Sequence, residues 1–306
     1  MSAQTVDDRP NSLPGCAALT RELGEPLAGT ATAIRSWLLL EQRGPWSLTA
    51  REDVLRAALP PERHDQLTAL ASTKGLRPLL VRRPGRSRTG PLTVLMASSL
   101  EGRTWVERRM VDDLAELDAL DLAQLADGVP GQGEPVEGPV YLVCTHGAKD
   151  LCCAVQGRPV AAALAAVAHD AVWECTHLGG HRFAANVAVL PDGLLYGQVP
   201  VERVTELALA HRSERLVPDL LRGRSRDEPA AQAAEIAVRR ERGLTGLADV
   251  QVLGTEQVQA CVLVHLRALG EVVDVTVEQV PLGCGGTTSC AGRTDPTALR
   301  AHVLPP

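Results

Sequence analysis

Apolar residues along the first third of the chain are spaced in a way that predicts a strand followed by two helices. A short apolar run at residues 34–40 (IRSWLLL) predicts a buried strand. Thr49 followed by Glu52 is a capping-box pattern and predicts the start of a helix. A second helix is expected over residues 62–71. Residues 1–30 are weakly patterned, and we expect them to wrap over the surface.

Three strand patterns follow before the middle of the chain. They lie at residues 77–81, 92–97 and 104–109, and a helix is expected to start near residue 113. Residues 127–138 (DGVPGQGEPVEG) are rich in Gly, Pro and acidic side chains. This composition is typical of a linker between domains.

The second half of the chain repeats a similar order. A buried strand ends in a cysteine-bearing loop, and Pro159 fits the first turn of the next helix. Pro191-Asp192-Gly193 predicts the turn of a hairpin. The remaining expected elements are strands at 139–144, 171–175, 186–190 and 194–199 and a helix at 201–213.

Both halves match the thioredoxin-like order, in which a crossover unit is followed by a hairpin and a helix. We therefore expect an α/β protein with mixed sheets, and an internal duplication. The predicted division is an N-terminal α/β domain over residues 1–135, degenerate and thioredoxin-like, and a second thioredoxin-like domain over 136–215. Residues 216–306 are expected to form a charged helical linker and a small antiparallel β appendage.

Composition narrows the class of protein. Of the 306 residues 45% are hydrophobic and 22% are charged, as in ordinary globular proteins. No apolar run reaches the roughly 18 residues of a membrane span, and the polar N-terminus lacks a signal-peptide pattern. We therefore expect a cytoplasmic protein with no membrane contact.

The charge balance argues against a nucleic-acid partner. The formal net charge is −6, whereas phosphate binding needs a concentrated positive surface. Two basic clusters, Arg82–Arg88 and Arg222–Arg226, sit among Gly, Pro and Ser. We expect both to be solvated loops.

Four of the eight cysteines lie within one short stretch of the sequence, which indicates metal or redox chemistry rather than packing. In a cytosolic chain reduced thiols are expected. The clustered residues are Cys144, Cys152, Cys153 and Cys175, followed by His177 and His181.

These side chains follow the C-terminal ends of predicted strands, the edge where sites collect in α/β sheets. Gly179 and Gly180 between the two histidines allow a tight fold that can aim both rings at one point. Two sulfur and two nitrogen ligands suit tetrahedral Zn²⁺, and they also suit a [2Fe–2S] cluster. The eight residues between Cys144 and Cys153 match neither a zinc knuckle nor the Rieske pattern, so the residues alone leave both metals open.

The same motifs resemble those of the sucrase/ferredoxin-like proteins, which carry a thioredoxin-like ferredoxin domain. The resemblance covers most of residues 15–213. It rests on Cys144-Thr-His-Gly with Lys-Asp-x-Cys-Cys153, on His177-x-Gly-Gly-His181-x-Phe-Ala-x-Asn186, on Tyr196-Gly197, and on Glu25-Pro-Leu-Ala-Gly-Thr30 with Trp37 and Gly44-Pro-Trp46.

The resemblance implies a [2Fe–2S] cluster in which a His pair replaces the second Cys pair of related ferredoxins. The implied ligands are Cys144, Cys153, His177 and His181. Cys152, beside Cys153, and Cys175 are the less favoured candidates. His146 is expected to donate to a sulfur, to contact a helix end, or to be a plain polar loop residue.

The function implied is one-electron transfer with an unidentified redox partner protein, so we expect a carrier more than a stand-alone enzyme. Imidazole ligands can change protonation, so the reduction potential should depend on pH. The alternatives are a structural zinc or interaction protein, and a thiol oxidoreductase, although no Cys-x-x-Cys motif precedes a helix. Cys261 is expected in the core, Cys16 is isolated, and Cys284 and Cys290 could form a second metal or redox site.

Overall fold

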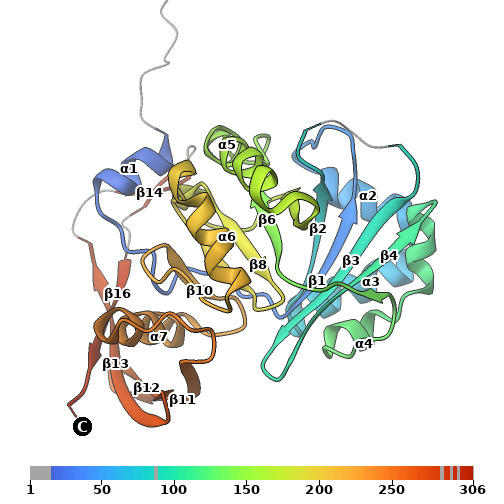
Figure 1. Cartoon of the computed structure of the whole chain (residues 1–306). Helices are drawn as coiled ribbons and strands as arrows, with labels where there is room; N and C mark the ends of the chain where they lie inside the picture. Colours follow the sequence, from blue (N-terminus) through green and yellow to red (C-terminus); the bar gives the residue numbers. More distant parts are fainter. Residues whose placement is uncertain (1–14, 86–88, 283–285, 290–291, 295–296, 306) are drawn as a thin grey trace, which may run out of the picture.

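The computed structural model describes residues 15–85, 89–282, 286–289, 292–294 and 297–305. Its largest element is a curled ten-stranded mixed sheet, and a separate four-stranded antiparallel sheet lies at the C-terminal end (Figure 1). This is the mixed α/β architecture with a β-rich appendage that the sequence predicts.

The large sheet has the strand order β10-β9-β8-β6-β7-β2-β1-β3-β4-β5. Its strands are β1 (Ser36–Glu41), β2 (Leu76–Arg82), β3 (Leu92–Leu100), β4 (Arg103–Val111), β5 (Glu134–Pro135), β6 (Val140–Cys144), β7 (Val172–Cys175), β8 (Val187–Leu190), β9 (Leu194–Tyr196) and β10 (Leu221–Arg224).

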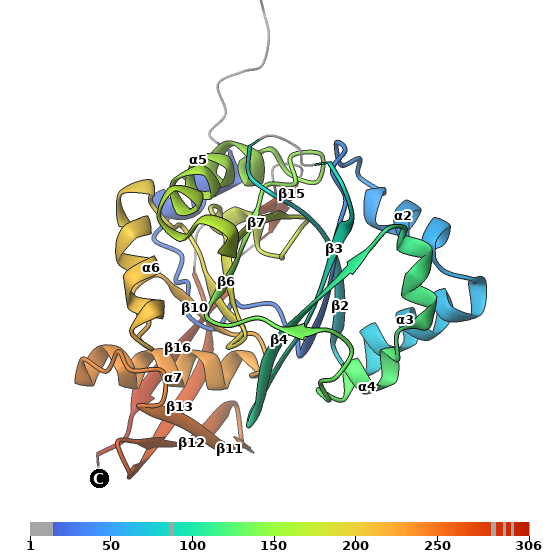
Figure 2. The ribbon, with the colours of Figure 1, turned by 45° about the vertical axis from the view of Figure 1, so that its right-hand side comes forward.

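Helices cover the two halves of this sheet from opposite sides, as Figure 2 shows. The first half carries α2 (Ala50–Ala58), α3 (Pro61–Thr73), η1 (Leu114–Ala119) and α4 (Leu122–Ala126). The second half carries α5 (Leu151–Ala168), η2 (His169–Ala171), η3 (His181–Phe183), η4 (Val201–Arg203) and α6 (Val204–Arg212).

The pleat of the strands divides the apolar residues between three cores. On β1, Leu38 faces the core under α2, α3 and α4, while Trp37 faces the opposite side. On β6, Tyr141 faces α5 and α6, while Leu142 faces the same inner core as Trp37. This inner core takes residues from both halves of the sheet, including Trp173 of β7. The strands are apolar on both faces because both faces are covered.

The two halves have the same topology. In each, the first strand pairs in parallel with the second and antiparallel with the third, and the third pairs antiparallel with the fourth. The resulting orders are β2-β1-β3-β4 and β7-β6-β8-β9. The expected thioredoxin-like order is therefore present twice. The halves join edge to edge through antiparallel pairing of β2 with β7. The division into domains at residue 135 stays a prediction.

The predicted linker takes part in the sheet. Residues 134–135 form β5, which pairs with β4. The backbone N–H groups of Gly131, Gln132 and Gly133 donate to the buried Glu107 carboxylate at 2.7–3.1 Å. This carboxylate gives the Gly- and Pro-rich segment a fixed path.

Helix α5 begins earlier than Pro159 predicted. Asp150 caps it, accepting from the N–H of Cys152 at 3.0 Å, so Cys152 and Cys153 lie in the first turn rather than in a loop. Pro159 lies inside the helix on its exposed side. One helical stretch of the described residues, Leu151–Ala171, is long and apolar enough to cross a membrane by length and composition alone. Its inward side packs in the core with β6 and α6.

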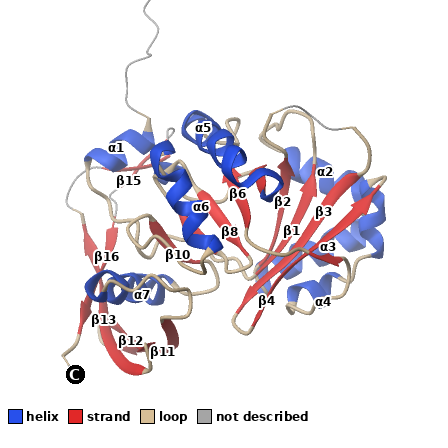
Figure 3. Cartoon of the chain, in the orientation of Figure 1, coloured by secondary structure: helices blue, strands red, loops and turns tan. Residues whose placement is uncertain are grey.

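The region after residue 215 differs most from the prediction. Its first part is β10, which extends the large sheet, and Arg222 and Arg224 are buried rather than solvated. Among the described residues after 215, the helix is α7 (Pro229–Arg242). This helix lies on the C-terminal sheet (Figure 3), which is formed by β11 (Val250–Val258), β12 (Cys261–Ala268), β13 (Glu271–Pro281) and β16 (Thr297–Val303).

The described part of the N-terminal segment lies on the surface and buries one side of a short helix, while residues 1–14 of the predicted wrap fall outside the described residues. Helix α1 (Cys16–Glu22) buries Cys16, Ala17 and Thr20 and packs against η3. A short ribbon of β14 (Gly286–Ser289) and β15 (Gly292–Thr294) lies beside the same helix.

Candidate metal centre

The end of β6 places Cys144 in the inner core, at the edge where the cysteine-bearing helix begins. Cys144 pairs in register with Cys175 of β7, and its side chain is 1% exposed. Gly157 of α5 packs directly on this point, because a Cβ there would lie 2.1 Å from the Cys144 carbonyl oxygen. The glycine therefore allows α5 to approach the strand.

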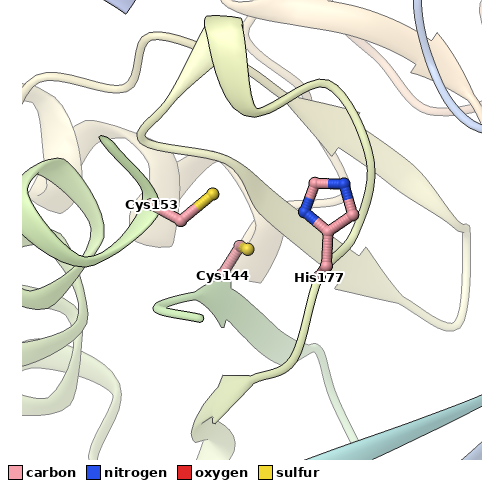
Figure 4. A group of neighbouring side chains, drawn as sticks. All are labelled: Cys144, Cys153 and His177. Carbon is pink, nitrogen blue, oxygen red and sulfur yellow. The ribbon is translucent and has the colours of Figure 1, made fainter. Parts of the chain in front are cut away.

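The first turn of α5 brings Cys153 next to Cys144. Cys153 is fully buried, and Figure 4 shows its sulfur turned toward that of Cys144. A helix N-terminus carries a partial positive charge, which favours a thiolate. The helix dipole and the capped first turn therefore prepare this pair of sulfurs to bind a cation.

The loop after β7 supplies the histidines. His177 faces the two sulfurs, and the ligand atoms of Cys144, Cys153 and His177 all lie within 4.8 Å of one another (Figure 4). The ring of His181 lies beside that of His177, with 5.1 Å between the ring centroids. His181 also lies near the Asp150 carboxylate, with Nε2 3.8 Å from Oδ2. The structure thus brings three of the predicted ligands together and places the fourth beside them.

The close approach of the two thiols shifts their pKa values in opposite directions. A hydrogen bond from Cys153 lowers the pKa of Cys144, and a hydrogen bond and charge from His177 lower it further. The same pairing raises the pKa of Cys153. The surroundings therefore favour the thiolate form of Cys144, the form in which cysteine binds metal.

The two glycines of the histidine loop are required by their neighbours. Gly179 has a φ of +94°, and a Cβ there would lie 2.0 Å from Thr32 Oγ1. Gly180 has a φ of +68°, and its Cβ would lie 2.3 Å from Arg222 Nη2. Both the left-handed backbone and the close packing exclude a larger residue.

Arg222 is a buried residue of the site that the sequence did not reveal. It is 1% exposed and donates from Nη1 to the Gly179 carbonyl at 3.0 Å and to Asn186 Oδ1 at 2.8 Å. Its Nε donates to Thr30 Oγ1 at 3.1 Å. Burial lowers the pKa of Arg222 to about 9, and the charge of Arg182 acts in the same direction. At neutral pH it places a positive charge near the two sulfurs while it holds the histidine loop.

The Glu25–Thr30 motif braces the same loop from the other side. Glu25 is buried and pairs with Arg182 at 2.8 Å, and Thr30 accepts from Arg222. Phe183, at the end of η3, is fully buried between the guanidinium groups of Arg182 and Arg222, 4.3 and 5.2 Å from its ring. The N-terminal motif is thus joined to the histidine loop by charge.

A second group of possible ligands lies next to the first. Cys16 of α1, Asp150 and Cys152 have ligand atoms within 4.8 Å of one another, and all three are buried. The two sulfurs are 3.5 Å apart. Cys152 therefore points toward α1, whereas its neighbour Cys153 points toward Cys144.

The other predicted residues lie outside both groups. Cys175 is fully buried in the inner core, and burial raises its pKa. The His146 ring contacts the Ser47 carbonyl at 2.9 Å rather than a sulfur. Cys261 is half-buried at the start of β12 rather than in the core. Cys284 and Cys290 fall outside the described residues.

The donor set fits a soft or borderline metal. Two buried thiols and an imidazole converge, and the buried Nδ1 of His177 has no hydrogen-bond partner among the described residues. Unsatisfied buried nitrogen atoms are rare in proteins and call for an explanation. A bound metal group would supply one, so the residues can bind metal.

Comparison with known proteins gives one result. The family model described as sucrase/ferredoxin-like matches residues 27–223 of the 306. No curated protein matches the chain. No solved structure matches it either. The matched span begins just before the Glu25–Thr30 motif ends and closes at β10, so it contains both halves of the large sheet and Arg222.

Proposed function

Because the chain belongs to the sucrase/ferredoxin-like family, we propose that it binds a [2Fe–2S] cluster and transfers single electrons. The proposed ligands are Cys144, Cys153, His177 and His181. When bound, such a cluster accepts and releases one electron. The observation that carries the proposal is the convergence of two buried thiols and a half-buried imidazole, with a second imidazole beside them.

The chain's own residues set the charge around the site. Two thiolates and two neutral imidazoles contribute half the negative charge of four thiolates, and Arg222 adds a buried positive charge. Both features favour the reduced state, so we expect a higher reduction potential than that of an all-cysteine ferredoxin. The imidazoles offer a site for a proton, so the potential is expected to fall as pH rises.

Metal content and colour test the proposal. Protein purified without oxygen should be brown and should contain about two irons and two acid-labile sulfides per chain. Replacing either histidine with cysteine should keep the cluster and lower its potential. A potential that stays flat between about pH 6 and pH 10 would argue against proton coupling.

A zinc site is the second candidate. The three ligand atoms within 4.8 Å of one another would also suit a single tetrahedral ion, with a fourth ligand beside them. A colourless protein that holds one zinc per chain and no sulfide would establish this structural role and exclude the cluster.

The remaining parts of the proposal concern the surroundings of the protein. We propose a protein redox partner in the cytoplasm, with no role for nucleic acid or a membrane. The net charge of −6 supports the exclusion of nucleic acid, and the packing of α5 in the core supports the exclusion of a membrane span. A thiol oxidoreductase has no further support, because Cys152 and Cys153 are adjacent rather than spaced as Cys-x-x-Cys.

A further inference from the structure

A recess beside His177 is lined by both halves of the chain. Its volume is about 330 Å³. Arg51 of α2 and Arg77 of β2 line it from the first half, and Lys149 and His177 line it from the loops of the second half. The recess therefore lies at the junction of the two halves and reaches one of the proposed ligands.

Three cations in this recess lack acidic partners. Among the residues that the structure describes, no carboxylate lies within ion-pair distance of Arg51, Arg77 or Lys149. In a chain with a net charge of −6 this gathering of positive charge stands out. A recess lined by charge of one sign attracts ligands of the opposite sign.

The one carboxylate on the wall of the recess is already occupied. Glu52 accepts from Arg56 Nε at 2.6 Å and lies 3.1 Å from His64 Nε2. Both partners lie outside the recess. Glu52 is therefore engaged by side chains outside the recess, and none of the three cations in the recess pairs with it.

The Arg77 guanidinium is incompletely hydrogen-bonded among the described residues. Its Nη2 donates to the His177 carbonyl at 3.2 Å, but its buried Nε has no hydrogen-bond partner among the described residues. A buried charged group is costly to leave without full pairing. Within the described part of the chain, the Arg77 guanidinium lines the recess without an acidic partner, and an oxyanion bound there would supply the opposite charge.

We propose that this recess binds a small molecule bearing a carboxylate or phosphate group, held against His177 by Arg77, Arg51 and Lys149. The volume is at the lower end of the range for small-molecule sites and exceeds the need of a single inorganic ion. Binding of this anion does not depend on the nature of the metal centre. Only its effect on the reduction potential rests on the proposed electron-transfer function.

Calorimetric titration of the purified full-length protein with inorganic phosphate and with citrate tests the site. We expect one anion per chain, and at least about tenfold weaker binding in Arg77→Gln and in Arg51→Gln, because each removes charge-assisted hydrogen bonds. Arg242→Gln, on the C-terminal unit, removes the same charge outside the recess and should bind like the parent. Circular dichroism checks that each variant is folded, and the second arginine keeps the test decisive if Arg77→Gln is unstable.

Several outcomes would overturn the assignment. These are no binding of either anion, or equal affinity in the parent and in a folded Arg51→Gln variant. A hexaglutamate peptide that binds more than about 100-fold tighter than citrate would replace the small molecule with an acidic polypeptide.

The effect of the anion on the reduction potential is a separate measurement. The oxidised centre is more positive, so it should bind the anion more tightly, and phosphate should lower the potential. A tenfold preference corresponds to about 59 mV for one electron. If the protein proves to hold no cluster, this effect disappears while the binding result still stands.

Discussion

The two adjacent cysteines at the start of α5 have different surroundings. Cys153 lies with Cys144 and His177, and Cys152 lies with Cys16 and Asp150. Successive residues of a helix point about 100° apart, so a one-residue offset decides which group a thiol joins. The placement of Cys153 supports its proposed role as a ligand.

Serine substitutions distinguish the two thiols. We expect Cys153→Ser to lose most of its metal, because a hydroxyl is a poor ligand for soft metals, while Cys152→Ser keeps a metal content close to that of the parent. Elemental analysis of both variants with a sulfide assay provides the measurement. Equal loss in the two variants would move Cys152 into the ligand set.

At the residue scale, the sequence indicated the thiols, the imidazoles and the two glycines of the histidine loop, but not the role of Arg222. Arg222 lies in a run with Gly and Ser, which is typical of a solvated loop. Its burial becomes evident only in the folded chain, where groups from distant segments accept its hydrogen bonds. These include the Thr30 hydroxyl, the Gly179 carbonyl and the Asn186 side-chain oxygen. Contacts between residues almost 200 positions apart leave no local pattern in a sequence.

The close contact of α5 with the end of β6 determines how the two sulfurs meet. It depends on Gly157, whose missing side chain leaves room for the Cys144 carbonyl. The predicted start of this helix at Pro159 was wrong, because proline is most common in the first turn of a helix but here lies further along it. The cap supplied by Asp150 starts the helix earlier. Pro159 is tolerated within the helix because it lies on the exposed side.

Gly157→Ala tests this contact. Alanine favours helix by about 0.5–1 kcal/mol, but its Cβ would force α5 away from β6, so we expect a net loss of about 1–3 kcal/mol in the free energy of unfolding and a lower metal content. Denaturant titration and elemental analysis measure both. Gly254→Ala in β11, where nothing lies within 4 Å, is the control and should stay within about 0.5 kcal/mol of the parent.

The turn between β10 and α7 carries a carboxyl group with an unusual titration. Burial, together with the negative charge of Glu235, raises the pKa of Asp227 to about 6. The folded protein therefore holds this proton more tightly than the unfolded chain does. The stability that the group contributes is complete below about pH 4 and is lost as pH rises through about 6.

Asp227→Asn should remove this dependence. We subtract the free energy of unfolding of the parent from that of the variant. This difference is expected to be about 2–3 kcal/mol larger at pH 7 than at pH 4. The difference is the informative quantity, because burial also lowers the pKa of His211 to about 4, and His211 affects stability with the opposite sign over this range. Urea titrations at several pH values measure it, and a constant difference would contradict the assignment.

The whole molecule is held together by the core inside the curled sheet. Trp37 of the first half and Trp173 of the second share this core with Cys144. Few backbone pairs join β2 to β7, so most of the cohesion between the halves comes from apolar burial. The succession of strands and helices in each half could be predicted largely from periodicity. The shared core could not, because buried strands are apolar on both faces whatever they pack against.

We therefore expect residues 27–223 to unfold in one cooperative transition. Tryptophan fluorescence and circular dichroism should give coincident denaturation curves. Trp37→Ala should lower the free energy of unfolding by about 3–5 kcal/mol and shift the whole transition, since it empties the core of both halves. Two separate transitions would instead support independent domains divided near residue 135.

The seam between β2 and β7 has a geometrical consequence. Glu41 ends β1 and pairs with Val81, as Cys144 ends β6 and pairs with Cys175, so Val81 and Cys175 hold equivalent positions in the two halves. These two residues face each other across the antiparallel seam. Self-pairing of equivalent residues is the signature of a two-fold axis. The backbone of the large sheet therefore has the pseudo-two-fold symmetry found in a homodimer, with Glu41 at the position in one half that Cys144, a proposed ligand, occupies in the other.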